Sequence, residues 1–258
     1  MKLSLPALPL LMLAAAPASA QEARDLRVRV GVGGQLIPKY VGAKDYKLFP
    51  LLDLDFAHGS DPFRFEVPDD SFSIPLIDSH GFAAGPSAKL ESKREDSDVG
   101  AAVGKVSTTF EAGLFAQYDD GTRFRVRGEV RKGLGGHEGV VGSIGADVYW
   151  RDGDRYVFSI GPRVDFSDER YQRAFFGVSP AASLATGLPV YNPGGGIHGI
   201  AAASGLSYQF NPRFGMFGYA RYERLVGDAG NSPLIRQFGS RDQVSGGVGL
   251  TYTFTVKH

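Results

Sequence analysis

The feature that most constrains the fold of this chain is a strict two-residue alternation in residues 243–254. Even positions carry apolar side chains or glycine and end in two aromatics, whereas odd positions are polar or very small. Because a strand directs successive side chains to opposite faces, this stretch is expected to be a strand with one apolar face. Most other long predicted strands repeat the pattern, with aromatics near their ends. The pattern predicts an all-β fold, an antiparallel transmembrane β-barrel that is apolar outside and polar inside. A soluble periplasmic β-sandwich is the alternative.

Turn signals divide the chain into about twelve such strands. They are residues 26–33, 48–56, 63–66, 71–76, 82–90, 110–118, 123–131, 140–151, 155–166, 200–210, 214–223 and 243–254. Every long connection follows an odd-numbered strand, and Asp-Gly signals at residues 119–121 and 152–154 mark tight hairpins. Outer-membrane barrels have an even strand number, short periplasmic turns and long outer loops. The N- and C-termini are therefore expected to be periplasmic.

Residues 1–20 have the composition of a cleaved signal peptide. Lys2 precedes the apolar run 3–16, and residues 18–20 read Ala-Ser-Ala, an A-x-A cleavage site. The mature chain is then the barrel, residues 21–258. An uncleaved anchor helix is the alternative, and no later segment has about 20 uninterrupted apolar residues.

Composition and motifs argue against several functions. Lys plus Arg and Asp plus Glu both total 28, which gives no reason to expect a nucleic-acid partner. Cysteine is absent, so disulfides and cysteine zinc sites are excluded. The five histidines show no H-E-x-x-H spacing, and His137 beside Glu138 is interpreted as a polar cap in a glycine-flanked loop. No catalytic, cofactor or metal site is predicted, and an enzyme is the minor alternative.

Charged residues are predicted to form a ladder on the inner face of the barrel. A charge on the lipid side costs roughly 2–4 kcal/mol at the bilayer midplane, so these side chains are expected to face the lumen unless they lie at the interface. The ladder comprises Arg123, Arg125, Arg127, Glu129, Arg131, Arg163, Arg221 and Glu223. Mutual salt bridges are the favoured interpretation, because buried charges need partners. The alternative is a basic pore lining that selects anions.

Two stretches are predicted to be loops. Residues 167–195 interrupt the alternation, and they are long enough to fold inward and narrow the pore. Residues 91–98 read ESKREDSD and are expected to be a solvated loop rather than a ligand site.

The sequence of the loop at residues 167–195 also resembles that of a known protein family. Its blocks are Arg170 with Tyr171, then Phe175, Phe176, Gly177, Val178, Ser179 and Pro180, then Ser183, Gly187, Leu188, Pro189, Tyr191 and the glycines 194–196. Further blocks occur in order at residues 38–42, 133–139, 222–225, 227–229, 232–233 and 252–254. Together they resemble the MipA/OmpV family of outer-membrane proteins, named for MltA-interacting protein. Four residues follow Phe254, where many outer-membrane barrels end on the aromatic.

The resemblance implies location in the bacterial outer membrane, in contact with its lipid. It also implies a scaffold that binds a lytic murein transglycosylase and a penicillin-binding protein during peptidoglycan remodelling. The alternative function is a narrow channel for small solutes with an arginine-lined lumen. Tyr171, Phe175, Phe176 and Tyr191 are interpreted as the small core of their own loop in preference to partner contacts.

Overall fold

The computed structural model describes residues 25–257, so the predicted signal peptide lies outside the described residues. Ten long strands and two short ones form one sheet. They are β1 (Leu26–Pro38), β2 (Tyr46–His58), β3 (Phe72–Ser73), β4 (Ile77–Ser79), β5 (Phe82–Glu91), β6 (Thr109–Asp119), β7 (Phe124–Leu134), β8 (Val140–Asp152), β9 (Tyr156–Ser167), β10 (Gly196–Gln209), β11 (Phe214–Leu225) and β12 (Asp242–Val256).

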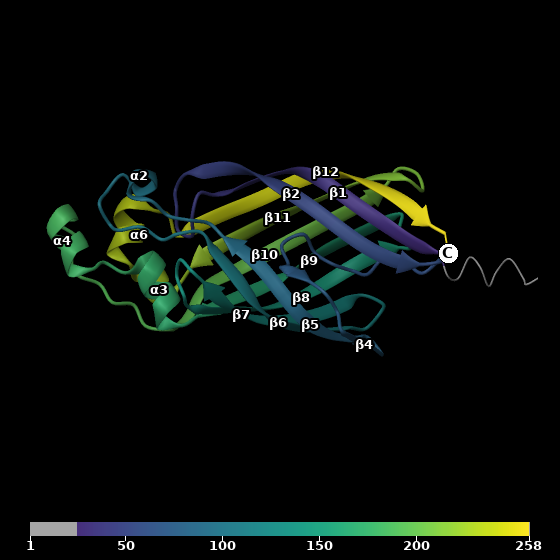
Figure 1. Ribbon diagram of the computed structural model, residues 1–258, viewed down its shortest axis with the longest axis horizontal. Helices are drawn as coiled ribbons and strands as arrows, with labels where there is room; N and C mark the ends of the chain where they lie inside the picture. The colour runs from purple at the N-terminus through teal and green to yellow at the C-terminus, as the bar shows by residue number, and fades with distance from the viewer. Residues whose placement is uncertain (1–24, 258) are drawn as a thin grey trace, which may run out of the picture.

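The sheet curls around its long axis into a half-barrel (Figure 1). Its strand order is β2-β1-β12-β11-β10-β9-β8-β7-β6-β5-β3, and β4 also pairs with β5. Each pairing is antiparallel, and β12 joins the N-terminal strand to the rest because Val28 faces Phe254 across the β1–β12 pair. The predicted all-β, antiparallel, twelve-stranded fold is confirmed.

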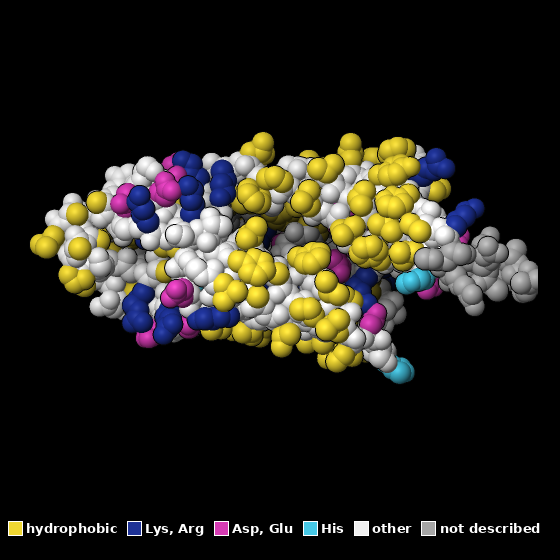
Figure 2. Space-filling view, viewed as in Figure 1, with side chains coloured by type: hydrophobic (Ala, Val, Ile, Leu, Met, Phe, Trp, Pro, Cys, Tyr) yellow, Lys and Arg dark blue, Asp and Glu magenta, His cyan; other side chains and the backbone are white. Residues whose placement is uncertain are grey.

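The two faces of the sheet differ as the alternation predicts. Apolar side chains on the outside are exposed, among them Leu52, Leu114 and Leu250, and Figure 2 shows such side chains spread over one face of the sheet. Aromatics gather where strands end; the rings of Phe214 and Tyr252 lie 5.1 Å apart. An apolar outer surface of this extent is what a hydrocarbon environment requires.

The connections at the two ends of the sheet differ in length. At the end where β1 begins and β12 ends, residues 120–123, 153–155 and 210–213 form short turns. Gly121 and Gly153 take positive φ angles of 72° and 52° there, the conformation that the Asp-Gly signals predict. At the opposite end the connections are longer and carry five short helices: α2 (Asp96–Val99), α3 (Glu169–Phe176), α4 (Pro180–Thr186), α5 (Gly227–Asn231) and α6 (Pro233–Phe238). Among the described residues, no helix has the length and apolarity needed to cross a membrane.

The helical end, which we call the cap, has its own hydrophobic core. Side chains from four long connections meet in it, including Tyr40, Val103, Phe176 and Leu234. Phe175 and Phe176 of α3 are fully buried. In Figure 1 the cap helices lie beyond the strand ends, so the cap extends the barrel along its axis.

One predicted strand is wrong. Residues 63–66 have no strand pairing, and residues 60–71, here called the inner segment, run inside the half-barrel. Phe63, Phe65 and Val67 are buried there. The alternation that suggested a wall strand is real, but its apolar face packs against lumen side chains rather than lipid. The next predicted strand, residues 71–76, is reduced to β3, and β4 occupies the position of the expected turn.

Candidate functional site

The charge ladder forms a connected network on the inner faces of β7, β8 and β9. The Arg125 guanidinium donates to Asp147 Oδ2 at 2.7 Å, and Arg163 Nη2 donates to Asp147 Oδ1 at 2.8 Å. All three side chains are almost completely buried. Two arginines therefore share one carboxylate, which leaves each with hydrogen-bonding capacity for a further acceptor.

A second group surrounds Arg131. Its Nε donates to Glu111 Oε2 at 2.9 Å, and its Nη1 bonds to Glu129. Arg127 donates to Glu129 Oε2 at 3.2 Å and lies 4.2 Å from the centre of the Phe115 ring. These contacts pair every buried arginine of β7 with a carboxylate, as stable burial of a charge requires.

The inner segment supplies two further carboxylates. Asp70 accepts from Arg125 Nη1 at 2.6 Å, and Asp69 accepts from Arg163 Nη2 at 3.2 Å and Arg221 Nη1 at 3.1 Å. Because these arginines stand on three different strands, β7, β9 and β11, the two aspartates bind the segment across the lumen.

Aromatic contacts hold the first half of the inner segment. Phe65 stacks on Tyr149 with the ring centres 4.3 Å apart, and the Arg125 guanidinium lies 4.9 Å from the Phe65 ring. Phe63 lies under the guanidinium groups of both Arg27 and Arg29. These cation–π contacts let apolar rings occupy an otherwise charged lumen.

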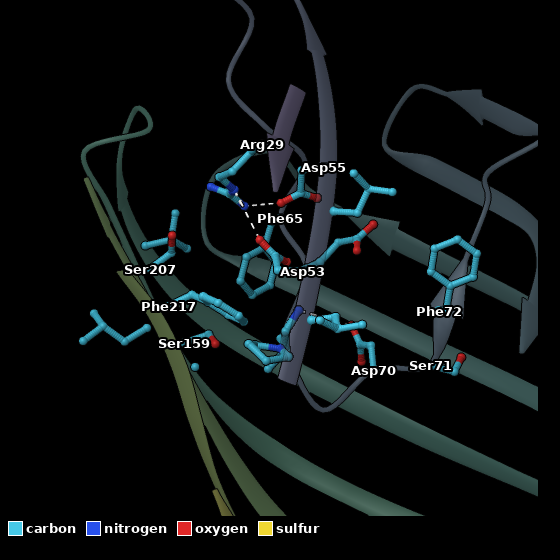
Figure 3. A pocket seen from close by; sticks show the side chains of 18 residues that line it. Arg29, Asp53, Asp55, Phe65, Asp70, Ser71, Phe72, Ser159, Ser207 and Phe217 are labelled. Atoms are coloured by element: carbon cyan, nitrogen blue, oxygen red, sulfur yellow. Dashed lines mark hydrogen bonds and ion pairs between the residues drawn. The ribbon is translucent and has the colours of Figure 1, made fainter. Parts of the chain in front are cut away.

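A smaller ionic group lies between β1 and β2. Figure 3 shows the Arg29 side chain directed at both Asp53 and Asp55, close to Phe65. The Arg29 Nε to Asp53 Oδ2 distance is 3.5 Å, and Arg29 also bonds to the buried Asp55. The adjacent cavity, between the inner segment and β9 to β11, measures about 150 Å³.

The inner segment nearly fills the middle of the lumen. The cavity lined by Asp69, Asp70, Arg163 and their neighbours measures about 20 Å³, little more than the space one water molecule occupies. Larger cavities of about 860 Å³ and 610 Å³ lie at the short-turn end and on the cap side. The described lumen is thus constricted at its centre.

Seven of the eight ladder residues line the lumen, and Arg123 does not. Arg123 lies in the exposed turn before β7, so the inward placement predicted for it is wrong. The turn places its side chain beyond the strand, where water solvates the charge. The alternation also gave no means of identifying Asp69 and Asp70 as ladder partners, because both lie outside regular strands.

The family loop contributes to the cap rather than to the lumen. Tyr171, Phe175 and Phe176 are buried in the cap core, and burial raises the pKa of Tyr171 well above its ordinary value. Tyr191 is half-buried and donates to the Asp228 carbonyl oxygen at 2.9 Å, while Gly177 is half-buried and Pro180, Gly187 and Pro189 are exposed. The constriction that residues 167–195 were expected to provide is made by the inner segment.

The run at residues 91–98 is only partly solvated. Arg94 is buried, and its Nη1 donates to the Phe175 carbonyl oxygen at 2.7 Å. Burial lowers the pKa of Arg94. The expected solvated loop is therefore wrong at this position, because the guanidinium ties the α2 connection to α3.

The side chain of His137 is buried and makes hydrogen bonds through both ring nitrogens. His137 Nδ1 accepts from the Gly139 N–H at 2.9 Å, which leaves Nε2 to donate to Glu111 Oε1 at 3.0 Å. The imidazole joins the cap to the ladder, so the predicted polar-cap interpretation holds with Glu111 as the partner. Within residues 25–257, no group of three or more His, Asp or Glu side chains is arranged to hold a metal ion.

Comparisons with known proteins found similar solved structures and one matching family. Similar solved structures include the KdgM porin, at 13% identity, covering 89% of this chain and 99% of that chain, with a TM-score of 0.38. An outer membrane channel from Pseudomonas putida F1 is similar at 9% identity, covering 96% of this chain and 100% of that chain, with a TM-score of 0.43. A search of curated protein sequences found no match.

The sequence profile of one family spans nearly the whole described chain. Residues 30–254 match the family described as MltA-interacting protein MipA. The match covers both the wall strands and the cap, and the wall has the apolar outer surface of a membrane barrel. The chain therefore belongs to the MltA-interacting protein MipA family and is an outer-membrane β-barrel.

Proposed function

We propose that this protein is a non-enzymatic scaffold that binds a lytic murein transglycosylase and a penicillin-binding protein. The observation that carries the proposal is the constricted lumen, whose central cavity is about 20 Å³. Because the inner segment blocks the lumen, we expect partner proteins to bind at the two ends of the barrel. The family description, MltA-interacting protein, supports a transglycosylase as the first partner.

In this proposal the short-turn end faces the periplasm, because outer-membrane barrels have short periplasmic turns. β1 begins and β12 ends on that side, and residues 1–20 direct export and are removed. Each short turn carries one exposed arginine: Arg123, Arg155 and Arg213. These three residues offer a charged contact surface to a murein enzyme on that side of the membrane.

Binding of the purified transglycosylase and penicillin-binding protein to the detergent-solubilised barrel tests the proposal. The triple variant R123E/R155E/R213E should lose most binding, because each exchange reverses a charge at the short-turn end. A matched variant, R170E/R173E/R236E, reverses three exposed charges of the cap and should bind normally. If the wild-type barrel binds neither enzyme, the scaffold proposal fails; equal losses in both variants contradict the assigned surface.

A narrow solute channel is the second candidate. Cavities of about 860 Å³ and 610 Å³ on the two sides of the constriction favour it, because a displaced inner segment would connect them. Planar-bilayer recording tests this function, and a folded barrel that never conducts would exclude it.

A further inference from the structure

The wall of the half-barrel has an unpaired seam. β2 lies at one end of the strand order and β3 at the other, and within residues 25–257 no strand pairing joins β2 to β3. Both strands run from the cap toward the short turns. Neighbouring strands of this sheet are antiparallel, so closing the wall would require a strand of opposite direction between β2 and β3. Pro50 of β2 has no N–H group to offer, as is common in edge strands.

The cavity on the cap side extends through this seam. Its lining includes the outward-facing Phe72 and Leu90, which are 61% and 62% exposed, together with Arg131 and Glu223 of the lumen. From the β2 side it is lined by Phe49, 42% exposed. Figure 2 shows this face of the molecule hollowed near its centre, between groups of hydrophobic side chains. The cavity thus joins the lipid-facing surface to the charged lumen.

The size of the cavity suits a small ligand. At about 610 Å³ it lies in the range of roughly 300–1,000 Å³ that small-molecule sites occupy. Its apolar lining is at the seam and its charged lining is in the lumen, so the complementary ligand has an apolar chain and a polar head.

The charges of the lumen favour a cationic head. Arg221 pairs with Asp69 at 3.1 Å, with Glu223 at 3.2 Å and also with Asp165. Arg163 also neutralises Asp69, but no other cation bonds to Asp165 or Glu223 among the described residues. Lys89 also lines the cavity, but its ion pair is with Glu91, at 3.9 Å. Asp165 and Glu223 therefore share one guanidinium at the cavity wall, and a second cation would be attracted there.

We propose that the seam is a lateral binding site for a single-chain amphiphile with an ammonium head. Its alkyl chain lies against Phe49, Phe72 and Leu90, and its head lies beside Asp165 and Glu223. The ligand enters from the bilayer through the gap between β2 and β3. This site does not depend on the scaffold, and it lies in the cap-side cavity that the channel candidate would also use.

Native mass spectrometry of the protein in a maltoside detergent, titrated with n-dodecylamine or n-dodecyl sulfate, tests the site. Both probes have the same tail, and the amine should bind about tenfold more tightly, a difference of about 1.4 kcal/mol. Glu223→Gln should reduce this preference, because it removes one of the two carboxylates. Equal affinity for the two probes overturns the proposal.

A second pair of variants tests the position of the tail. Ala88 lines the cavity, and its cross-strand partner Ala112 also lies on the wall but outside the lining. Ala88→Trp should abolish amine binding, whereas Ala112→Trp should leave it unchanged. If A88W does not fold, as judged by heat-dependent gel mobility, Leu90→Ser and the control Leu114→Ser replace the pair. Identical binding by the seam variant and its control overturns the proposal.

Discussion

Release of the inner segment by the double exchange Asp69→Asn and Asp70→Asn should open the lumen. Asp69 accepts hydrogen bonds from Arg163 and Arg221 at 3.2 Å and 3.1 Å, and Asp70 accepts from Arg125 at 2.6 Å. The exchange removes both negative charges but keeps the side-chain shape. The three arginines then lose a counter-charge, while Asp147 and Asp165 still pair with them.

The expected effect follows from the cost of breaking buried ion pairs. Removing one partner of such a pair costs about 3–5 kcal/mol. Because asparagine retains an acceptor oxygen, we expect the lower value for the double exchange, about 3 kcal/mol. Since about 1.4 kcal/mol corresponds to a tenfold change, the population with the segment out of the lumen should rise about a hundredfold.

Single-channel recording in planar bilayers measures this population as the frequency of discrete openings. Asp61→Asn is the matched control, because it makes the same exchange in the same segment where the side chain is exposed and the contact to Arg27 involves only the carbonyl oxygen. Openings as rare as in the wild type, in a double variant with normal heat-dependent gel mobility, would refute the assignment of these carboxylates as the anchors.

Three further exchanges test other parts of the fold. Phe175→Ala should destabilise the cap core by about 3–5 kcal/mol and expose the long loops to limited proteolysis while the strands stay protected. Ile144→Arg, on the lipid face of β8, should cost roughly 2–4 kcal/mol near the bilayer midplane and lower the yield of folded protein in lipid vesicles, whereas Ser143→Ala on the lumen side should not. Asp120 accepts from the backbone N–H groups of the β6–β7 turn, which hold its pKa well below the usual range. Its stabilising contribution is present above the pKa of an unfolded aspartate and is lost as the pH falls toward the folded value, so Asp120→Ala should lower the melting temperature at pH 7 and much less in strong acid.

The sequence predicted the wall because lipid imposes a simple rule on it. At residues 244–256 of β12 and 140–150 of β8, each outward position is apolar or glycine, so alternation alone predicts which face each side chain lies on. Arg125, Arg127 and Arg131 followed from the same rule, since an arginine on the lipid side would be too costly. Arg123 departs from it because the strand begins one residue later, and strand ends are the least certain part of any such prediction.

The inner segment is an exception to the rule that an alternating apolar face lies against lipid. Phe63, Phe65 and Val67 alternate with charged residues just as wall strands do, yet they face Tyr149 and several guanidinium groups. Alternation reports that one side of a segment is apolar, but not which apolar or aromatic surface covers it. Asp69 and Asp70 lie in the turn that follows Val67, and the sequence does not show their ion pairs. Their partners Arg125 and Arg163 are distant in sequence, and only the folded barrel brings them together.

The pairing of the ladder weakens the anion-filter interpretation and changes what a channel would require. A filter attracts anions only if carboxylates do not already neutralise its cations. Here the guanidinium groups of Arg125, Arg131 and Arg221 each contact two or more carboxylates. With the inner segment displaced, Asp69 and Asp70 leave with it, and Arg163 and Arg125 keep only Asp147. Opening would therefore shift the selectivity of the lumen toward anions relative to the closed barrel. Reversal potentials measured in a salt gradient decide this: the openings of the double asparagine variant, which lacks these two charges in either state, should be at least as anion-selective as the rare openings of the wild type.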